Sequence, residues 1–302
     1  MHEENDVRAF ITGGGGFVGG HLAQHLKDSG DEVTVADREC DVTDRAAVSV
    51  ALTATRPDVI YHLAAMTSVA ESWSRPNEFT RVNVLGTAHL VDAAHEAVPE
   101  ARVVVVSSAE VYGIVREDEL PLTENSPTVP ANPYSTSKLE AEHVAREAVR
   151  SRHQSVVIAR PFNHIGPGQS TAFVVPALVR RLLDATAEGR HFIFVGDLTT
   201  RRDFSDVRDV VRAYRLLSEW GRPGDAYNVA SGHDVALADI AEEIRRRINP
   251  DVELLVDPEL LRPVEMPVSR GSSQKLHDTT GWEPTIALAR SLDDVIAVER
   301  AR

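Results

Sequence analysis

Three glycines, Gly13, Gly16 and Gly19, separate a β-forming run at residues 7–12 from a helix-forming stretch at residues 21–27. This order predicts a strand, a glycine-rich turn and a helix. Small residues at this spacing let the backbone turn sharply, approach a pyrophosphate and present a helix N-terminus to its charge. The pattern GxxGxxG differs by one residue from GxGxxG, and no Lys-Ser or Lys-Thr pair follows it, so a P-loop is excluded.

The same alternation continues along the first half of the chain. The residue patterns predict a helix at residues 44–55, and they predict strands at residues 32–36, 58–62, 101–106 and 155–159. Alternating strands and helices indicate an α/β fold with a doubly wound parallel sheet. After residue 160 proline and glycine become frequent. We therefore predict a dinucleotide-binding domain at 1–160 and a smaller α/β substrate-binding domain mainly at 161–302, with the chain returning to the first domain around 204–215.

Asp37 ends the second predicted strand, 24 residues after Gly13. A carboxylate at this position accepts a hydrogen bond from the adenosine ribose 2′-OH, which favours NAD. Arg38 beside it suits the 2′-phosphate of NADP. The sequence therefore predicts a dinucleotide cofactor and leaves NAD and NADP as alternatives.

Composition excludes several classes of partner. The chain has 32 basic and 46 acidic residues, a formal net charge of −14, and this charge repels nucleic acid and anionic membrane surfaces. The acidic start does not resemble a signal peptide, no apolar stretch approaches the ~20 residues of a membrane span, and Cys40 is the only cysteine. We expect a cytoplasmic protein without a disulfide. No HExxH pattern accompanies the 12 histidines, so we expect no metal.

Tyr134 and Lys138 stand four residues apart, which is one turn on the same face of a helix. A cation at this distance lowers the pKa of a phenol, so we expect Tyr134 to serve as an acid or base near neutral pH. Residues 107–113 follow the apolar strand that ends at Val106, where parallel sheets place their active sites. Both motifs therefore meet at the same sheet edge. The alternative for the Tyr-Lys pair alone is an exposed helix face.

Together these motifs resemble the extended short-chain dehydrogenases/reductases that act on nucleotide sugars. The resemblance extends from residue 8 to about 285 and rests on TGGGGFVG (12–19), HLAA (62–65), SSAEVYG (107–113), YSTSK (134–138), RPFNHIGPGQ (160–169), RRDFSDVRDVVRAY (201–214), YNVASG (227–232) and RPVEMP (262–267). It implies a Rossmann-type sheet, an NAD or NADP cofactor and a nucleotide-sugar substrate.

The stretches FNHIGPGQ and RDFSDVRDVVRAY and the tail most resemble the branch that acts on GDP-linked mannose derivatives. The length of 302 residues and the direct run from the second strand into Asp37 are similar to its C4-keto reductases. The resemblance implies reduction of GDP-4-keto-6-deoxy-D-mannose by NAD(P)H. The alternatives are a GDP-mannose 4,6-dehydratase, another nucleotide-sugar epimerase or dehydratase, and a sensor that binds NAD(P) without turnover.

The resemblance also implies roles for individual residues. Tyr134 exchanges a proton with the sugar oxygen, Ser108 hydrogen-bonds that oxygen, and Lys138 anchors the cofactor ribose. Glu110 stands where 4,6-dehydratases keep a base, whereas Ala109 stands where some of them carry an aspartate. The implied cofactor site comprises Gly13, Gly16, Phe17, Val18, Gly19, Asp37, Arg38, Asp41, Val42, Leu63, Ala64, Ala65, Tyr134, Lys138 and Pro161.

The implied substrate site comprises Ser108, Asn163, Phe173, Val174, Arg202, Arg262 and Glu265. Arg202 and Arg262 match the family's diphosphate-binding arginines, and guanidinium forks suit phosphate. The alternative for each arginine is a surface ion pair, with Asp203 or with Glu265. The helices expected at about 76–98 and 134–149 carry small aliphatic faces. In this family such faces form a homodimer through a four-helix bundle, and an intramolecular core is the alternative.

Overall fold

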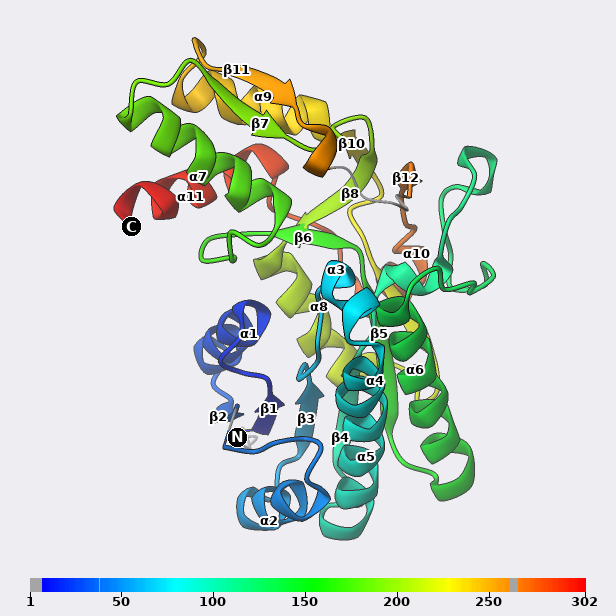
Figure 1. Ribbon diagram of the computed structural model, residues 1–302. Coiled ribbons are helices and arrows are strands. Elements are labelled where there is room, and N and C mark those ends of the chain that lie inside the picture. Colours follow the sequence, from blue (N-terminus) through cyan, green and yellow to red (C-terminus); the bar gives the residue numbers. More distant parts are fainter. Residues whose placement is uncertain (1–6, 38, 261–265) are drawn as a thin grey trace.

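The computed structural model describes residues 7–37, 39–260 and 266–302 (Figure 1). Arg38, Arg262 and Glu265, three residues that the sequence predicts for the site, lie outside the described residues. Among the helices that are described, none is long and apolar enough to cross a membrane.

The main sheet contains six parallel strands in the order β2-β1-β3-β4-β5-β9. Its strands are β1 (Arg8–Thr12), β2 (Glu32–Ala36), β3 (Val59–His62), β4 (Arg102–Val106), β5 (Val156–Pro161) and β9 (Ala226–Val229). The predicted parallel sheet is thus confirmed, and the first five strands lie where the sequence places them to within two residues. Because β2 and β3 lie on opposite sides of β1, the strand order reverses there, which is where such sheets bind ligands.

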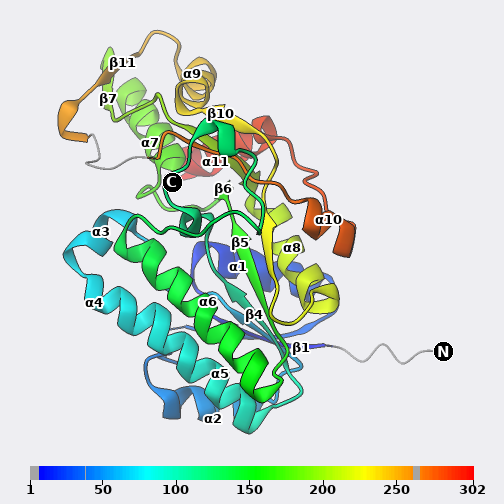
Figure 2. The ribbon, with the colours of Figure 1, turned by 90° about the vertical axis from the view of Figure 1, so that its right-hand side faces the viewer.

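Helices cover both faces of the main sheet, as a doubly wound fold requires (Figures 1 and 2). Buried residues of α1 (Phe17–Asp28) and α8 (Val207–Trp220) form one apolar core with the sheet. The core on the other face includes buried residues of α2 (Arg45–Thr55), α5 (Gly86–Ala97) and α6 (Pro133–Arg152). Helix α1 begins four residues earlier than the apolar pattern predicts, directly after Gly16.

The helix predicted at residues 76–98 contains a π-helical segment. It runs from α4 (Pro76–Phe79) through the π-helix η1 (Thr80–Leu85) into α5 without leaving helical dihedral angles. Single π-helical turns inside α-helices are frequently found at functional sites. The remaining short elements before β5 are α3 (Val69–Ser74) and the 3₁₀ turns η2 (Ala109–Tyr112) and η3 (Glu117–Glu119).

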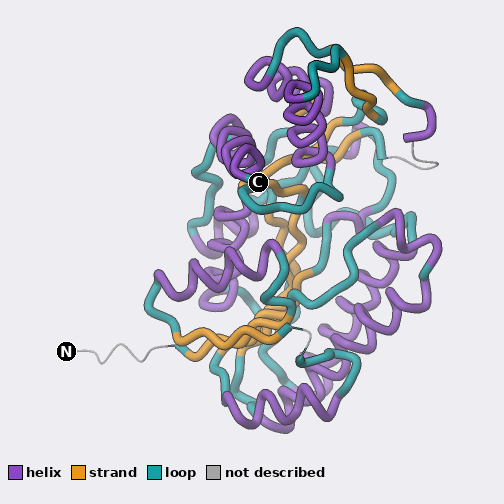
Figure 3. The backbone as a smooth tube through the Cα atoms, turned by 60° about the vertical axis from the view of Figure 1, so that its left-hand side comes forward, coloured by secondary structure: helices purple, strands orange, loops and turns teal. Residues whose placement is uncertain are grey.

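Smaller sheets lie beyond the carboxyl ends of the main strands (Figures 1 and 3). One contains β10-β8-β12, with β6 paired to β8, and the other pairs β11 with β7. Their strands are β6 (Asn163–Ile165), β7 (Phe192–Val195), β8 (Arg201–Asp206), β10 (Asp234–Ala236), β11 (Glu253–Val256) and β12 (Val268–Ser269). Helices α7 (Val174–Ala187), α9 (Leu237–Ile248) and α11 (Leu288–Ala301) supply most of a separate apolar core.

The chain passes between the two regions more than once. Strand β8 leads directly into α8, whose N-cap Asp206 accepts a hydrogen bond from the Arg208 backbone N–H. Two later elements, β9 and α10 (Gln274–Thr280), pack at the main sheet, and the 3₁₀ turn η4 (Pro258–Leu260) follows β11. The domain boundary near residue 160 stays a prediction.

Candidate active site

The glycine turn after β1 lies close to the backbone that follows β3. Gly13 has a φ of +69°, and a Cβ atom on it would lie 2.7 Å from the backbone nitrogen of Ala64. A Cβ atom on Gly19 would lie 2.5 Å from the Gly13 carbonyl oxygen. Gly16 caps α1 without a side-chain hydrogen bond, so the first helical N–H groups are not capped by a side chain. A closely approached backbone and a helix N-terminus fit a pyrophosphate.

Asp37 lies beside this turn at the end of β2. A Cβ atom on Gly15 would lie 2.2 Å from Asp37 Oδ2, so the carboxylate lies directly against the glycine turn. This position fits a hydrogen bond to an adenosine ribose. Because Arg38 is outside the described residues, the structure leaves the choice between NAD and NADP open.

The other predicted cofactor residues also follow carboxyl ends of main strands. Thr12 at the end of β1 accepts a hydrogen bond at Oγ1 from the Ala64 backbone N–H over 3.2 Å, and this bond joins the two strand ends. Val42 is buried against Gly86, and Pro161 ends β5. The rest lie nearby in sequence, half-buried or exposed: Phe17, Val18, Asp41, Leu63 and Ala65.

Ser108, Tyr134 and Lys138 meet at the carboxyl end of β4. Ser108 is the second residue after that strand, and Tyr134 lies in the first turn of α6, which Asn132 caps by accepting a hydrogen bond from the Ser135 backbone N–H. The Ser108 hydroxyl lies near enough to the Tyr134 phenol to lower its pKa. Lys138 donates from Nζ to the Val106 carbonyl over 2.9 Å. The structure thus brings both predicted motifs to one sheet edge.

Burial controls the titration of this cluster. It raises the pKa of Tyr134 to about 12, with the Ser108 hydroxyl acting against this shift and the charge of Glu110 acting in the same direction as burial. The expectation of a lowered tyrosine pKa is therefore wrong in this structure, because desolvation of the phenolate and the charge of Glu110 outweigh the effect of Ser108. Burial also lowers the pKa of Lys138 to about 8, while Glu142 raises it.

Apart from Ser108, the described substrate residues lie in the region of the smaller sheets. Asn163 is exposed at the start of β6, and Phe173 and Val174 are exposed where α7 begins. Arg202 on β8 is buried, and so is Asp203, so a surface ion pair between them is excluded. Asp203 instead accepts hydrogen bonds from the backbone N–H groups of Ser231, Gly232 and Gly271 and from the Ser231 hydroxyl. These bonds hold the strand that carries Arg202.

A chain of buried polar side chains, which the sequence pattern does not predict, connects the glycine turn to α6. His62 Nδ1 lies 2.8 Å from Thr12 Oγ1, and its Nε2 lies 3.0 Å from Thr87 Oγ1. Thr87 donates to the Asn83 carbonyl, and the Asn83 amide donates to Ser137 Oγ over 2.9 Å. Asn83 belongs to the π-helical segment. The available signal was polar residues at positions where the surrounding pattern is apolar.

A second missed feature is the buried pair of Glu142 on α6 and Arg160 on β5. Burial raises the carboxyl's pKa and the guanidinium of Arg160 lowers it, with a lowered value as the net result. The sequence signal was a charged residue inside the otherwise apolar run 156–161.

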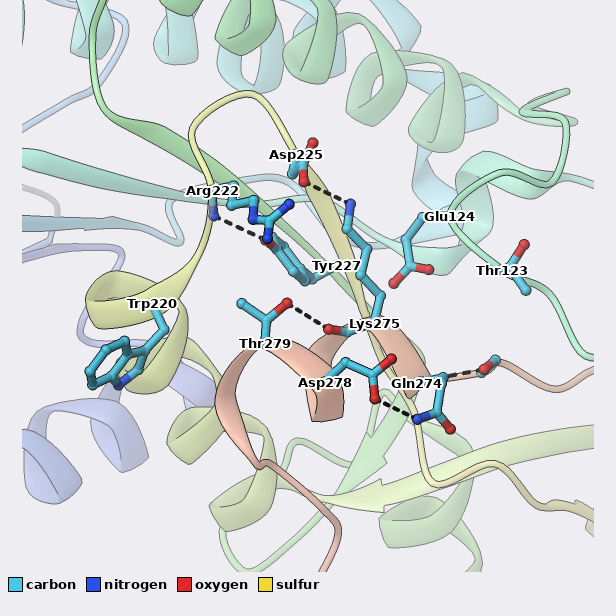
Figure 4. Close-up of a pocket in the computed structure, with 11 residues that line it drawn as sticks. Thr123, Glu124, Trp220, Arg222, Asp225, Tyr227, Gln274, Lys275, Asp278 and Thr279 are labelled. Carbon is cyan, nitrogen blue, oxygen red and sulfur yellow. Dashed lines mark hydrogen bonds and ion pairs between the residues drawn. The ribbon is translucent and has the colours of Figure 1, made fainter.

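A cavity of about 590 Å³ lies away from this cluster, at the outer edge of the main sheet beside β9 and α10 (Figure 4). None of the sequence-predicted site residues lines it. Lys275 crosses it with an ion pair to Asp225 and a cation–π contact to Tyr227. No group of three or more His, Cys, Asp or Glu residues in the described part of the chain could hold a metal ion.

Comparison with known proteins places this geometry among related enzymes. Residues 9–230 match the model of the NAD dependent epimerase/dehydratase family. The chain is 35% identical to GDP-6-deoxy-D-mannose reductase of Pseudomonas aeruginosa, covering 96% of each protein, and 30% identical to human dTDP-D-glucose 4,6-dehydratase, covering 92% of this chain and 86% of that one. The solved structure of RMD from Pseudomonas aeruginosa complexed with NADPH superposes with a TM-score of 0.91 at 34% identity, covering 98% and 99% of the two chains.

Proposed function

Because the chain belongs to the NAD dependent epimerase/dehydratase family, we propose that it is an NAD(P)-dependent oxidoreductase of nucleotide sugars. Its reaction is the reduction of the C4 ketone of GDP-4-keto-6-deoxy-D-mannose to GDP-6-deoxy-D-mannose, which is also called GDP-D-rhamnose. The observation that carries this proposal is the meeting of Ser108, Tyr134 and Lys138 at the end of β4. The 35% identity to a GDP-6-deoxy-D-mannose reductase over nearly the whole chain supports the substrate.

Tyr134 and Ser108 act on the sugar oxygen. Reduction of a ketone places negative charge on its oxygen, and this charge is relieved when a proton arrives and a hydrogen-bond donor stabilises it. A tyrosine whose pKa is raised to about 12 stays protonated at neutral pH, which suits a proton donor. Ser108, whose hydroxyl lies beside the phenol, donates to the same sugar oxygen.

The glycine turn and Asp37 fit a dinucleotide. The backbone at Gly13 and the start of α1, which no side chain caps, would hold the pyrophosphate, and Asp37 would accept a hydrogen bond from the ribose. When bound, NAD(P)H supplies the hydride. Lys138 holds a positive charge at the end of β4, where its ammonium group would hydrogen-bond the nicotinamide ribose. Arg202 and Asn163 bind the sugar diphosphate, and Phe173 and Val174 line the base pocket.

Ala109 favours a reductase, whereas Glu110 is the reason that a 4,6-dehydratase is a second candidate function. A 4,6-dehydratase eliminates water and requires a dedicated acid and base beside the tyrosine. Ala109 supplies no proton. Glu110, however, lies close enough for its charge to raise the pKa of Tyr134, so a carboxylate is present beside the tyrosine.

A substrate panel tests the proposal. GDP-4-keto-6-deoxy-D-mannose, GDP-mannose and UDP- and dTDP-hexoses are incubated with NADH, NADPH, NAD and NADP, and products are identified by mass. We expect one reduced cofactor to be consumed per molecule of GDP-4-keto-6-deoxy-D-mannose. Loss of water from GDP-mannose without net cofactor consumption assigns the dehydratase instead. Binding of NAD(P)H without turnover of any sugar assigns the sensor.

We further propose a homodimer formed through a four-helix bundle of α5 and α6. A groove of about 400 Å³ lies on these two helices, lined by Ala88, Val91, Asp92, His143, Val144, Glu147 and Arg152. Multi-angle light scattering tests it: the native chain is expected at twice its mass of 33.0 kDa, and Val144→Asp is expected to give monomers. A cytoplasmic location fits the single cysteine.

A further inference from the structure

Glu142 and Arg160 form an ion pair in the interior, directly behind the Ser108–Tyr134–Lys138 cluster. Their side chains are 0% and 3% exposed. Arg160 donates from Nε to Glu142 Oε1 over 2.8 Å and from a terminal nitrogen to Oε2 over 2.7 Å, so the pair is bidentate. Two parallel hydrogen bonds between planar groups fix distance and orientation together.

The pair joins three elements. Glu142 lies on α6, one turn after Lys138, and Arg160 lies on β5. Ser107, the first residue after β4, donates its hydroxyl to Glu142 Oε1 over 2.7 Å. Glu142 therefore contacts the residue next to Ser108 and belongs to the helix that carries Tyr134 and Lys138.

The hydrogen-bond network continues from Arg160, away from Lys138, to Tyr112 and Asn228. Arg160 donates to the Tyr112 hydroxyl over 3.0 Å, and its guanidinium lies 5.0 Å from the centre of that ring. Tyr112 donates to Asn228 Oδ1, and the Asn228 backbone N–H donates to Glu124, which lines the cavity in Figure 4. Fully bonded buried networks are rigid, because each group has a specified partner.

We propose that Glu142, held by Arg160, is a positioning residue for the reaction: it sets Ser108 against Tyr134 through Ser107 and places a carboxylate one helical turn from Lys138. The inference rests on the proposed function for its turnover measurements. A buried ion pair often adds little net stability, so its bidentate attachment at this place is better explained by the geometry that it imposes.

The charges around Lys138 come from each element that packs near it. Glu142 lies on its own helix, with Arg146 and Arg160 neutralising part of the carboxylate charge. On β3, His62 is neutral, and its pKa is lowered first by burial and then by Lys138. Glu110, after β4, is near Tyr134. Glu142 is the group that raises the pKa of Lys138.

The test compares three variants, each assayed below its melting temperature. Glu142→Gln keeps the side-chain shape and removes the charge, and we expect kcat to fall about 10- to 100-fold because sub-ångström errors in reactive geometry have effects of this size. The KM for the sugar nucleotide should change less than about threefold, since Arg202 and Asn163 are elsewhere. Ser107→Ala removes only the link to β4, and we expect a loss of about 3- to 10-fold.

Glu299→Gln is the matched control. Glu299 is 2% exposed and paired with Arg180 on the smaller core, so the change is equally buried and equally charged but distant from the site. It should lower the melting temperature and leave kcat within about twofold. A folded Glu142→Gln protein with kcat within about threefold of the native value overturns the proposal, and so does an equal loss in Glu299→Gln. If Glu142→Gln does not fold, Ser107→Ala decides by the same criterion.

A second readout does not require turnover. The chain has three lysines, Lys27, Lys138 and Lys275, so ¹⁵N-labelled lysine gives three side-chain signals, and Lys138→Met identifies one of them. We expect the Lys138 titration to move to lower pH in Glu142→Gln and to stay in place in Glu299→Gln. No shift in Glu142→Gln overturns the proposal. If the native chain reduces no GDP-sugar, the proposed function fails and this titration alone decides the inference.

Discussion

Lys138 Nζ lies 2.9 Å from the carbonyl oxygen of Val106, the last residue of β4. This hydrogen bond attaches the first turns of α6 to the strand that delivers Ser108. The side chain of Lys138 is buried, so the Val106 carbonyl takes the place of water at the ammonium group, and Glu142 acts on it through its charge. The Lys138 ammonium group therefore links α6 to β4 and is also the group whose pKa Glu142 raises.

Tyr134→Phe removes the proposed proton donor and keeps the ring. We expect kcat to fall by about 10²-fold or more, with little change in the Kd for NADPH, because the hydroxyl acts mainly in the transition state. Steady-state kinetics and fluorescence titration measure the two effects. Tyr61→Phe is the control, since its buried hydroxyl bonds Ser218. Near-native turnover by Tyr134→Phe removes this tyrosine from the mechanism.

The dependence of kcat/KM on pH should follow the titration of Lys138. Its pKa is lowered to about 8, so the ammonium form is lost as pH rises through that value. If the charged form is needed, kcat/KM falls above about pH 8, and this limb belongs to the free enzyme. Lys138→Met should show low activity without that limb. A native profile that stays flat to pH 10 contradicts the assignment.

Asp37 should make the enzyme prefer NADH to NADPH. Its carboxylate lies against Gly15, and a 2′-phosphate bound there meets like charge. We expect Asp37→Ala to raise kcat/KM for NADPH relative to NADH by about tenfold, which corresponds to about 1.4 kcal/mol. Asp28→Asn, at the far end of α1, is the control and should leave the ratio unchanged. An unchanged ratio in Asp37→Ala shows that another residue selects the cofactor.

His62 should make the fold sensitive to acid. Burial, followed by the charge of Lys138, lowers its pKa to about 3, whereas an unfolded histidine titrates near 6.5. Between these values the unfolded chain binds the extra proton, so this contribution to stability is present above pH 6.5 and decreases by about 1.4 kcal/mol per pH unit below it. Urea unfolding at pH 7.5, 6.5 and 5.5 measures this dependence.

His62→Gln removes the titrating group and keeps two hydrogen-bonding atoms toward Thr12 and Thr87. The variant should be less stable at pH 7.5 and lose less stability on acidification than the native chain. His153→Gln, an exposed control, should reproduce the native dependence. An equal pH dependence in His62→Gln and the native chain locates the acid sensitivity at another group.

Local patterns were sufficient for the architecture. Apolar strands such as 102–106, the glycines after β1 and the Pro133 start of α6 each follow from short-range preferences, and parallel strands bring their carboxyl ends to one edge. The convergence of Ser108 with Tyr134 and Lys138 could therefore be expected before any coordinates. Helix α1 was predicted short because glycine in its first turn weakens the apolar pattern.

The amino-acid sequence by itself determined the doubly wound sheet, the dinucleotide turn and the Ser-Tyr-Lys cluster, because each depends on residues close in sequence or on the topology of parallel strands. Only the tertiary structure decided how these residues titrate and what supports them. Desolvation raises the pKa of Tyr134, and the partners of His62 and Glu142 come from strands and helices distant along the chain. Burial and long-range pairing depend on how the whole chain packs, and no local pattern records them.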